Sequence, residues 1–545
     1  MKRTACTLSV VVVWLLLCTV AASASPGVHR WTASAGPPSA TATPQPFPIC
    51  TALLNQAAPA VSGDIVVWSD ARNTTASGSD IYLYDFSTGQ ERAICNAPAD
   101  QSRVAVSGTR IVWMDARNTT TTGIDIYAYD LATGTESPVC TAAGDQQSPS
   151  ISGNRIVWMD ARNTTTTGID ISAYDLATGT ESPVCTAAGD QSLPVVSGNR
   201  VVWRDTRNQA TTQMDIYMYD LSTGTESPVC TAAGDQGDPV IYADVVLWED
   251  MRNAAVSAQD IFMKVLPAGE ETAIVTAPGN QGGISIWGDK VVYEDQRAML
   301  LTGSDVYLYD LDARAETVVS TAPGNQQAAR ICAGTIVWRD GRNAAASGSD
   351  IYGAYVDVTP PETTVGGVPS AWVNHEVTAT FSAADPADDR SGIAYTEYSI
   401  DGGTTWARGG SVTISAAGET TLKYRSADRA GNVEADRTAS VRIETGLPST
   451  TAMPVTVKAK KTATLKFSVA DPTPSAGSAT VTIQIRRPGG KLVRTLAVGT
   501  VTTNVPLTYK WKATVRKGAY TYRVLATDAA GNVATSIGSA TLKVK

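Results

Sequence analysis

The feature that most constrains the fold is a tryptophan-centred motif that recurs every 45 residues without slippage. Its first copy is Val66-Val67-Trp68-Ser69-Asp70-Ala71-Arg72-Asn73. The later copies are centred on Trp113, Trp158, Trp203, Trp248, Tyr293 and Trp338. A fixed period of about 45 residues indicates one supersecondary unit that is stacked repeatedly. The array therefore predicts an architecture more firmly than it predicts an activity.

Each unit is expected to contain four β-strands. In the third copy they correspond to residues 148–152, 155–160, 170–175 and 181–185, separated by segments rich in Gly, Asn, Asp and Thr. The Ile-Val-Trp run of residues 156–158 is continuous rather than alternating, which predicts a strand buried on both faces. Four strands in such a period are typical of a β-propeller blade. A linear solenoid is the alternative, but it would need polar end caps that the sequence does not show.

The two ends of the array complement each other. The seventh copy reaches Asp350-Ile351-Tyr352 and then gives way to Thr359-Pro360-Pro361, without a fourth strand. The segment 47–52, Phe-Pro-Ile-Cys-Thr-Ala, matches the fourth strand of the third copy at 182–187, Ser-Pro-Val-Cys-Thr-Ala. We therefore expect the N-terminal strand to complete the last sheet and to close a ring of seven blades, because closure leaves no edge between the first and last blades.

The N-terminus predicts export. Residues 1–24 have a charged start, an apolar run from Leu8 to Val20 and the small-residue pattern Ala22-Ser23-Ala24, as in a secretory signal peptide. An uncleaved anchor is disfavoured because the apolar run is shorter than the ~20 residues that span a bilayer. A lipoprotein modified at Cys18 is disfavoured because Leu17 precedes that cysteine. We expect a disordered leader over 25–45 and no membrane span in the mature chain.

Two further units follow the array, which we place at 46–358. Residues 359–447 and 450–545 both end in an Asp-x-Ala-Gly-Asn turn and are interpreted as related Ig-like β-sandwiches. Residues 450–545 carry fifteen Lys and Arg against two Asp, a net charge of +13. The net charge is −5 for 360–449 and −17 for 1–359. The basic unit either adheres to anionic envelope polymers or only presents solvated strand faces.

Five cysteines recur on the same grid, at Cys50, Cys95, Cys140, Cys185 and Cys230. Equivalent positions in successive repeats are expected to be too far apart for the Cα separation of about 7 Å that a disulfide tolerates. Val275 and Ser320 occupy the same slot in later copies. We interpret the cysteines as small buried hydrophobic residues, and disulfide pairing is the alternative that the even count leaves open.

A constellation of Asp70, Arg72 and Asp80 recurs in every copy and ends with Asp340, Arg342 and Asp350. One interpretation is a ring of charge that binds a ligand or Ca²⁺. The favoured interpretation is a structural ion network that holds the connecting loop and the neighbouring blades. An active site is normally unique in a chain, whereas a fold element repeats.

Nothing in the sequence identifies a catalytic, cofactor-binding or metal-binding residue. Glycoside hydrolysis needs only two carboxyl groups, but the departures from the repeat are mild, and no Asp/Glu pair stands apart from it. These departures from the repeat are Tyr293, Ala298, Trp287 and the segment Met263-Lys264-Val265. Asn73, Asn118 and Asn163 fit the glycosylation sequon, with a polar turn as the favoured interpretation.

The array resembles the TolB-type β-propeller of exported bacterial proteins. The resemblance rests on Ser-Gly-x-x-Val-Val-Trp-x-Asp-x-Arg-Asn, on Asp-Ile-Tyr-x-Tyr-Asp-Leu-x-Thr-Gly and on a glutamine that begins each repeat, from Gln56 to Gln326. TolB itself looks like a six-bladed propeller behind a separate N-terminal domain, so the resemblance does not imply a role in the Tol system. The second unit resembles the Ig-like repeats of bacterial surface proteins and extracellular glycosidases. The third is similar to the Ig-like domain of flagellar hook-cap proteins.

These observations predict a secreted or cell-surface binding protein. The propeller would present a rim to a protein or glycan of the cell envelope, and the Ig-like units would serve as spacer and attachment. We expect a monomer that is not an enzyme, needs no cofactor and does not bind nucleic acid. The alternatives are an extracellular carbohydrate-active hydrolase or lyase and a structural envelope component.

Overall fold

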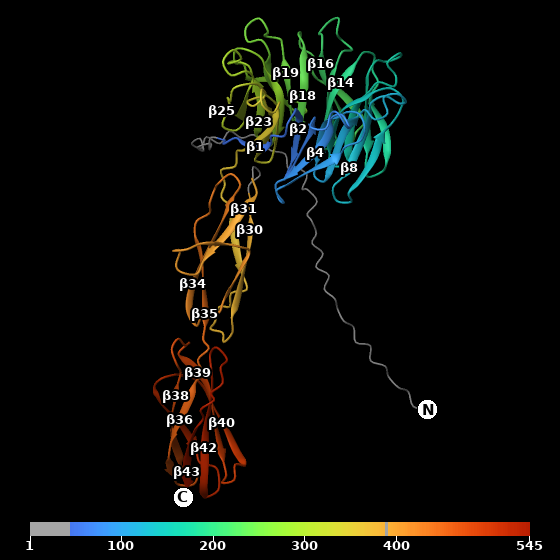
Figure 1. Ribbon diagram of the computed structural model, residues 1–545. Helices are drawn as coiled ribbons and strands as arrows, with labels where there is room; N and C mark the ends of the chain where they lie inside the picture. Colours follow the sequence, from blue (N-terminus) through green and yellow to red (C-terminus); the bar gives the residue numbers. More distant parts are fainter. Residues whose placement is uncertain (1–43, 387–390) are drawn as a thin grey trace, which may run out of the picture. The chain divides into compact units, whose positions relative to one another are not determined.

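The structure is a computed structural model that describes residues 44–386 and 391–545. The signal peptide and nearly all of the leader predicted above fall outside the described residues. Within these ranges the secondary structure consists of 43 β-strands and no helix, which confirms the all-β prediction (Figure 1). No helix that could cross a membrane occurs in these ranges. The described residues form two compact units, the first of 46–332 and 336–353 and the second of 44–45, 333–335 and 354–545.

The repeat region forms seven four-stranded antiparallel sheets, an arrangement typical of a β-propeller. The first four sheets consist of β2 (Gln56–Ser62), β3 (Ile65–Asp70), β4 (Asp80–Asp85) and β5 (Gln90–Cys95); β6 (Gln101–Ser107), β7 (Arg110–Asp115), β8 (Asp125–Asp130) and β9 (Thr135–Cys140); β10 (Gln146–Ser152), β11 (Arg155–Asp160), β12 (Asp170–Asp175) and β13 (Thr180–Cys185); and β14 (Gln191–Ser197), β15 (Arg200–Asp205), β16 (Asp215–Asp220) and β17 (Thr225–Cys230).

The remaining three sheets of the repeat region include both ends of the array. They consist of β18 (Gln236–Tyr242), β19 (Val245–Asp250), β20 (Asp260–Val265) and β21 (Thr272–Val275); β22 (Gln281–Trp287), β23 (Lys290–Asp295), β24 (Asp305–Asp310) and β25 (Ala315–Ser320); and β26 (Gln326–Cys332), β27 (Thr335–Asp340) and β28 (Asp350–Tyr355) with β1 (Phe47–Cys50). The prediction of four strands in each unit is therefore confirmed.

The second strand of each sheet is the centre of the packing. In β3, Val66, Val67 and Trp68 are all fully buried, which confirms the strand covered on both faces. Neighbouring sheets supply the cover, since the side chains of one strand alternate between two faces. Burying one large aliphatic or aromatic side chain contributes ~1.5–3 kcal/mol. The seven copies of this strand thus provide much of the hydrophobic stabilisation of the first unit.

The N-terminal strand completes the last sheet, as the sequence predicted. β1 pairs antiparallel with β28, with Phe47 opposite Gly353 and Cys50 opposite Ile351. The first strand of each sheet contacts that of the next, and β26 contacts β2 in the same way. The backbone N–H of Gln56 donates to the carbonyl of Ser349 at 2.8 Å, as the N–H of each equivalent glutamine does to the preceding sheet. The sheets therefore close on themselves, with β2, β6, β10, β14, β18, β22 and β26 as the innermost strands.

The second unit contains four sheets that belong to two successive parts of the chain. In residues 362–443 they are β29 (Glu362–Gly366), β30 (Val377–Ala384) and β33 (Ser411–Ile414), and β32 (Ala407–Arg408), β31 (Ile393–Ser399), β34 (Gly418–Asp428) and β35 (Arg437–Ile443). In residues 449–544 they are β36 (Ser449–Met453), β38 (Thr462–Ala470) and β41 (Pro506–Lys512), and β37 (Val455–Val457), β43 (Gly538–Val544), β42 (Gly518–Asp528), β39 (Ser478–Arg486) and β40 (Leu492–Thr502).

Each of these two parts has its own hydrophobic core. Leu422 and Val441 are buried in the first, and Leu465, Ile483 and Tyr522 in the second. The hydroxyl oxygen of Tyr522 lies 2.5 Å from the carbonyl oxygen of Met453 and 2.8 Å from that of Lys466, which share its one proton as acceptors. That hydroxyl joins the two sheets of the second part, because the carbonyls belong to β36 and β38 whereas Tyr522 belongs to β42.

Candidate functional site

The recurring Asp/Arg constellation is a buried structural network, which we call the Asp–Arg hub. In the first sheet the indole N–H of Trp68 donates to Oδ2 of Asp70 at 2.8 Å. Arg72 donates to both oxygens of the same carboxylate, at 2.9 and 2.6 Å. Arg72 also donates to Glu91 at 2.6 Å and stacks on the ring of Tyr82, 4.1 Å from its centroid. Asp70 and Asp80 are fully buried, which favours the structural interpretation over an exposed ring of charge.

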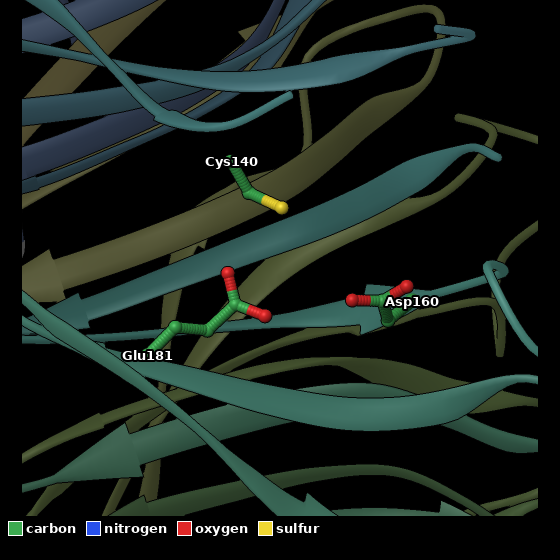
Figure 2. A group of neighbouring side chains, drawn as sticks. All are labelled: Cys140, Asp160 and Glu181. Atoms are coloured by element: carbon green, nitrogen blue, oxygen red, sulfur yellow. The ribbon is translucent and has the colours of Figure 1, made fainter. Parts of the chain in front are cut away.

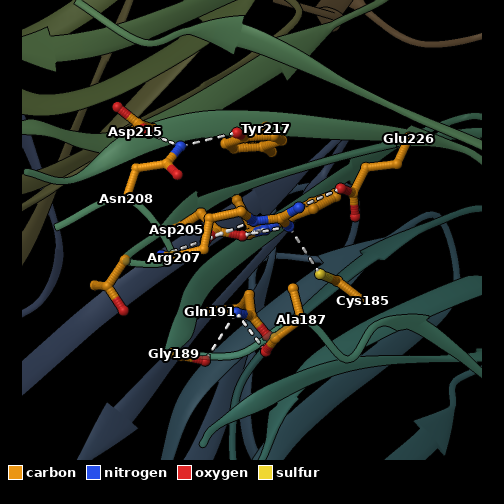
Figure 3. A network of polar contacts seen from close by, with 12 residues as sticks. Cys185, Ala187, Gly189, Gln191, Asp205, Arg207, Asn208, Asp215, Tyr217 and Glu226 are labelled. Carbon is orange, nitrogen blue, oxygen red and sulfur yellow. Dashed lines mark hydrogen bonds and ion pairs between the residues drawn. The ribbon is translucent and has the colours of Figure 1, made fainter. Parts of the chain in front are cut away.

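The hub also joins neighbouring sheets, as Figure 3 shows for the fourth sheet. Nη2 of Arg207 donates to Sγ of Cys185 in β13, the last strand of the preceding sheet, at 3.1 Å. Cys50, Cys95, Cys140 and Cys230 accept the equivalent bond. Where Ser320 replaces cysteine, its hydroxyl accepts from Arg342 at 3.3 Å.

All six cysteines in the described residues are buried and none of them forms a disulfide, so the disulfide alternative is wrong for them. The interpretation of the grid cysteines as purely hydrophobic residues is incomplete. Each of these sulfurs accepts a hydrogen bond from an arginine of the next sheet, which is a directional link as well as a packing contact. Burial raises the pKa of Cys185 to about 12, so the thiol stays neutral and unreactive.

The loop between the two recurring aspartates, Asp70 and Asp80 in the first sheet, is fixed by its own polar groups. Nδ2 of Asn73 donates to Asp80 at 2.9 Å, and the hydroxyl of Ser77 donates to the other oxygen at 2.7 Å. Asn118 and Asn163 make the same contact with Asp125 and Asp170, at 2.8 and 3.0 Å. The three asparagines of the sequons therefore stabilise turns, which confirms the polar-turn interpretation.

Cys140, Asp160 and Glu181 converge in the third sheet and resemble a set of metal ligands (Figure 2). The guanidinium group of Arg162 lies among them, 2.6 Å from Asp160 and 2.6 Å from Glu181. It also donates to Cys140 at 3.3 Å. The arginine supplies the positive charge that a metal ion would otherwise bring, so this group is one more Asp–Arg hub.

One hub lacks its aromatic side chain. Six sheets place a ring under the arginine, from Tyr82, Tyr127, Tyr217, Phe262, Tyr307 and Tyr352. The third sheet has Ser172 at this position, beside a cavity of about 110 Å³ that Arg162 also lines. The side chain of Arg162 is accordingly 33% exposed, whereas that of Arg207 is 21% exposed.

A polar cleft of about 200 Å³ lies between the fifth and sixth sheets, at β19, β22 and β23. It is lined by Glu249, Gln259, Asn280, Gly282, Gly283, Glu294 and Gln296. Most of these side chains differ from those at the equivalent positions of the other sheets. The position between Trp and Asp, for example, is occupied in chain order by Ser69, Met114, Met159, Arg204, Glu249, Glu294 and Arg339.

This cleft corrects the expectation that no carboxylate pair stands apart from the repeat. Oε1 of Glu249 accepts from the backbone N–H of Gly283 at 2.8 Å, and its other oxygen accepts from Gln259. Oε1 of Glu294 accepts from the backbone N–H of Ala328 at 2.5 Å. Each glutamate therefore reaches the bulged innermost strand of the next sheet. The signal that could have found them is two consecutive copies with Glu in the Trp-x-Asp motif.

Two adjacent glycines make room for these carboxylates. A Cβ atom on Gly282 would lie 2.5 Å from the carboxylate of Glu249. A Cβ atom on Gly283 would lie 2.3 Å from the carboxylate of Glu294, and Gly283 has a positive φ of 58°. Larger side chains at these positions would displace the glutamates, so the glycines and the carboxylates form one arrangement.

The surroundings of the cleft oppose ionisation of both glutamates. Burial, followed by the nearby charge of Asp238, raises the pKa of Glu249 to about 8. Burial also raises the pKa of Glu294, against the opposing effect of Arg330 and Arg339. The surroundings of Glu249 therefore oppose its ionisation.

The other residues noted from the sequence lie outside this cleft. Lys264 donates to the carbonyl of Val229 at 2.7 Å, and Trp287 packs on Tyr242 with ring centroids 5.1 Å apart. Fourteen of the fifteen basic residues of the third sequence unit are exposed, which agrees with either interpretation of its charge. They are Lys458, Lys460, Lys461, Lys466, Arg487, Lys491, Arg494, Lys510, Lys512, Arg516, Lys517, Arg523, Lys543 and Lys545.

Comparisons with known proteins agree with the fold. No protein family and no curated protein matches the sequence. Among solved structures, TolB from Acinetobacter baumannii is 17% identical, with a TM-score of 0.36 over 47% of this chain and 62% of that chain. The extracellular domain of a putative hybrid two component system from B. thetaiotaomicron is 9% identical, with a TM-score of 0.38 over 74% and 59% of the two chains.

A third similar structure is the acylaminoacyl peptidase of Pyrococcus horikoshii, which is 13% identical, with a TM-score of 0.39 over 60% of this chain and 57% of that chain. The chain thus matches less than two thirds of each of these three proteins. The seven four-stranded sheets and the cyclic contacts of their first strands agree with the TolB-like propeller predicted from the repeat motifs. At these identities and TM-scores, the matches carry no argument about activity or ligand.

Removal of a hub arginine is expected to destabilise the first unit. Arg207→Ala would leave the buried carboxylate of Asp205 without its cation, a loss of ~3–5 kcal/mol for a broken buried ion pair. Chemical denaturation followed by tryptophan fluorescence measures this loss. Arg92→Ala, at an exposed position, is the control and should change the midpoint little. Equal effects of the two substitutions would show that the hub is not a main source of stability.

Filling the incomplete hub is expected to stabilise the protein. Ser172→Tyr would place a ring under Arg162, as in the other sheets, and an exposed cation–π pair contributes ~0.5–1 kcal/mol. The thermal unfolding midpoint should rise, whereas Ser182→Tyr at an exposed position of the neighbouring strand should leave it unchanged. A lower midpoint for Ser172→Tyr would mean that the third sheet has adapted to the smaller side chain.

The raised pKa of Glu249 predicts a pH-dependent stability. Because the folded pKa of about 8 exceeds the unfolded value, the protonated carboxyl stabilises the fold fully below pH ~4.3, and this contribution is lost as the pH rises through 8. Glu249→Gln should therefore become more stable than the wild type as the pH rises, in thermal unfolding from pH 5 to pH 9. Met159→Gln, at the same position of the third sheet, should parallel the wild type. Parallel curves for all three proteins would contradict the assigned shift.

Proposed function

We propose that the chain is an extracellular binding protein that holds a hydroxyl-rich glycan of the cell envelope in the cleft of Glu249 and Glu294. In this proposal the seven sheets are the blades of one seven-bladed propeller, in agreement with the cyclic contacts of their innermost strands. The observation that carries the proposal is that the lining of the cleft departs from the repeat. The hubs recur in every sheet and hold the fold, whereas the residues that line the cleft mostly do not recur.

The chemistry of the lining fits sugar hydroxyl groups. A hydroxyl both donates and accepts hydrogen bonds, and the amides of Gln259, Asn280 and Gln296 offer both functions. The cleft is smaller than the ~300–1,000 Å³ of sites for drug-sized ligands, so it suits a single sugar unit at the end or on a branch of a glycan.

Hydrolysis of a glycan is the second candidate, because two carboxyl groups face one cleft and Glu249 could act as an acid. Such catalysis requires a second carboxyl group that is ionised at the working pH, as base or nucleophile. The pKa of Glu294 is also raised, which opposes that role. The pair therefore favours binding over hydrolysis.

The remaining units fit a role in presentation. In the proposal, residues 359–447 and 450–545 are Ig-like domains that serve as spacer and attachment. The exposed Lys and Arg side chains and the charge of +13 support contact of the last domain with anionic polymers. Such contact would weaken with salt, since the Debye length falls from ~10 Å at 0.1 M to ~3 Å at 1 M.

Co-sedimentation of the mature protein with isolated cell envelopes, at low and at high salt, tests both parts of the proposal. Binding that persists at high salt is assigned to the cleft, and binding that high salt releases is assigned to the basic domain. Gly282→Gln should abolish the salt-resistant part, because its side chain would fill the cleft, while other sheets carry Gln147 and Gln327 at this position. The matched control is Gly237→Gln, where a Cβ atom would lie 3.8 Å from Glu249.

The proposal fails if Gly282→Gln and the wild type retain equal salt-resistant binding. It also fails if no binding is found with any envelope fraction. Release of soluble sugars from the pelleted envelopes by the wild type, and not by Glu249→Gln, would instead establish the hydrolase.

A further inference from the structure

The most basic part of the chain buries the only two acidic residues that it has. Residues 450–545 contain fifteen Lys and Arg, and their two carboxylates are Asp471 and Asp528. Asp471 directly follows β38, and Asp528 is the last residue of β42. They are only 3% and 5% exposed, and they meet Glu444, which follows β35 and is fully buried. Surface ion pairs with the abundant cations would be the ordinary arrangement, so this burial requires an explanation.

The three carboxyl groups point toward one another and are short of hydrogen-bond donors. One oxygen from each lies within 4.8 Å of the other two. Four of their oxygens have no hydrogen-bond partner, namely Oε1 of Glu444, both oxygens of Asp471 and Oδ2 of Asp528. Within residues 44–386 and 391–545, no Lys, Arg or His forms an ion pair with them. Buried carboxylates without partners are strongly unfavourable.

The backbone around the cluster is held in place. The N–H of Asn532 donates to Oδ1 of Asp528 at 2.7 Å, and its Nδ2 donates to the carbonyl of Glu444 at 2.9 Å. The N–H of Ala476 donates to Oε2 of Glu444 at 2.9 Å. Nδ2 of Asn504 donates to the carbonyl of Asp471 at 2.8 Å. These bonds fix the residues that carry the carboxyl groups and leave the oxygens that face the centre free.

We propose that Glu444, Asp471 and Asp528 form a Ca²⁺-binding site. Ca²⁺ takes oxygen ligands at 2.3–2.6 Å, so ligands on opposite sides of the ion lie ~4.8 Å apart. One oxygen from each of the three residues lies within this distance of the other two, so the three can share one such ion. Mg²⁺ requires ~2.0–2.1 Å and a near-octahedral shell that retains water, which a buried group of three carboxylates suits less well. Their charge also exceeds what one monovalent cation would neutralise.

A similar acidic cluster earlier in the chain differs because protein groups donate hydrogen bonds to most of its carboxylate oxygens. Asp357, Asp385 and Asp428 also converge. Asp357 accepts from the N–H and hydroxyl of Ser391, at 2.7 and 2.8 Å, and Asp428 accepts from the N–H and Nδ2 of Asn432, at 2.8 and 2.9 Å. In the described residues, only Oδ1 of Asp385 lacks a donor. Protein groups satisfy all but one oxygen of this cluster, so the proposal is confined to Glu444, Asp471 and Asp528.

The competing explanation is that the cluster holds protons instead of a metal ion. Burial, and then the charges of Asp471 and Asp528, raise the pKa of Glu444 to about 7. Shared protons would relieve the repulsion without any cation. The two explanations differ in what Ca²⁺ does to the protein, which makes them separable by experiment.

Calcium titration of the full-length mature protein tests the site. After treatment with a chelator, isothermal titration with CaCl₂ should show one equivalent bound to the cluster, and Ca²⁺ should raise a thermal unfolding midpoint. Asp471→Asn, and independently Glu444→Gln, should weaken this binding by at least ~tenfold, because loss of even an outer contact of a metal site costs 10–100-fold. Asp385→Asn is the matched control and should bind as the wild type does. MgCl₂ should bind at least ~tenfold more weakly than CaCl₂.

The proposal is overturned if Ca²⁺ produces neither heat nor a shift in the unfolding midpoint of the wild type. It is also overturned if Asp471→Asn and Glu444→Gln, verified as folded by circular dichroism, retain wild-type binding. Stabilisation of the calcium-free protein by Asp471→Asn, without any binding by the wild type, would establish the proton explanation. Equal binding of Mg²⁺ would contradict the assignment of the ion.

Discussion

The structure of the first unit depends on one buried carboxylate in each sheet, at the end of the second strand. In the first sheet this is Asp70, which accepts hydrogen bonds from the indole of Trp68 and from the guanidinium of Arg72. Through the arginine it connects the loop, the outer strand and a cysteine or serine of the preceding sheet. A fully buried carboxylate is tolerated only when it is paired and hydrogen-bonded in this way. The Asp-x-Arg pair that recurs in all seven copies follows from that requirement.

Because the Asp–Arg hub stabilises all seven sheets, other positions of the repeat can differ from one sheet to the next. The residue between Trp and Asp points to the innermost strands, and it is serine, methionine, arginine or glutamate in different sheets. In two neighbouring sheets it is Glu249 and Glu294, with Gly282 and Gly283 beside them. The raised pKa of Glu249 means that burial opposes its ionisation. Natural proteins retain such unfavourable groups mainly where function requires them.

Much of the architecture could be predicted from the sequence because it is encoded locally. The continuous apolar run ending at Trp68 indicates a doubly covered strand, and the likeness of residues 47–52 to 182–187 predicts the pairing of β1 with β28. The cleft was missed because it depends on the register between sheets. Glu249 meets the amide of Gly283, 34 residues later, only through the bulge of β22. No pattern within one repeat shows that contact.

The acidic cluster of the second unit was missed for a related reason. The Asp-x-Ala-Gly-Asn motif at 528–532 predicts a turn, and the structure forms that turn. The same turn also orients Asp528 toward Glu444 and Asp471, which are distant in the sequence. The scarcity of acidic residues in 450–545 was the available signal, because two carboxylates among fifteen cations would be expected to pair at the surface.

The most direct test of the account is to replace both glutamates of the cleft by a residue that other sheets carry at the same position. Glu249→Met combined with Glu294→Met introduces the side chain that the second and third sheets carry at this position, as Met114 and Met159. The account predicts a folded protein with an unfolding midpoint at or above that of the wild type at pH 8, and with no salt-resistant binding to cell envelopes. Unfolding of this variant would show that the two glutamates are required for the stability of the fold. Undiminished binding would show that the cleft is not the site.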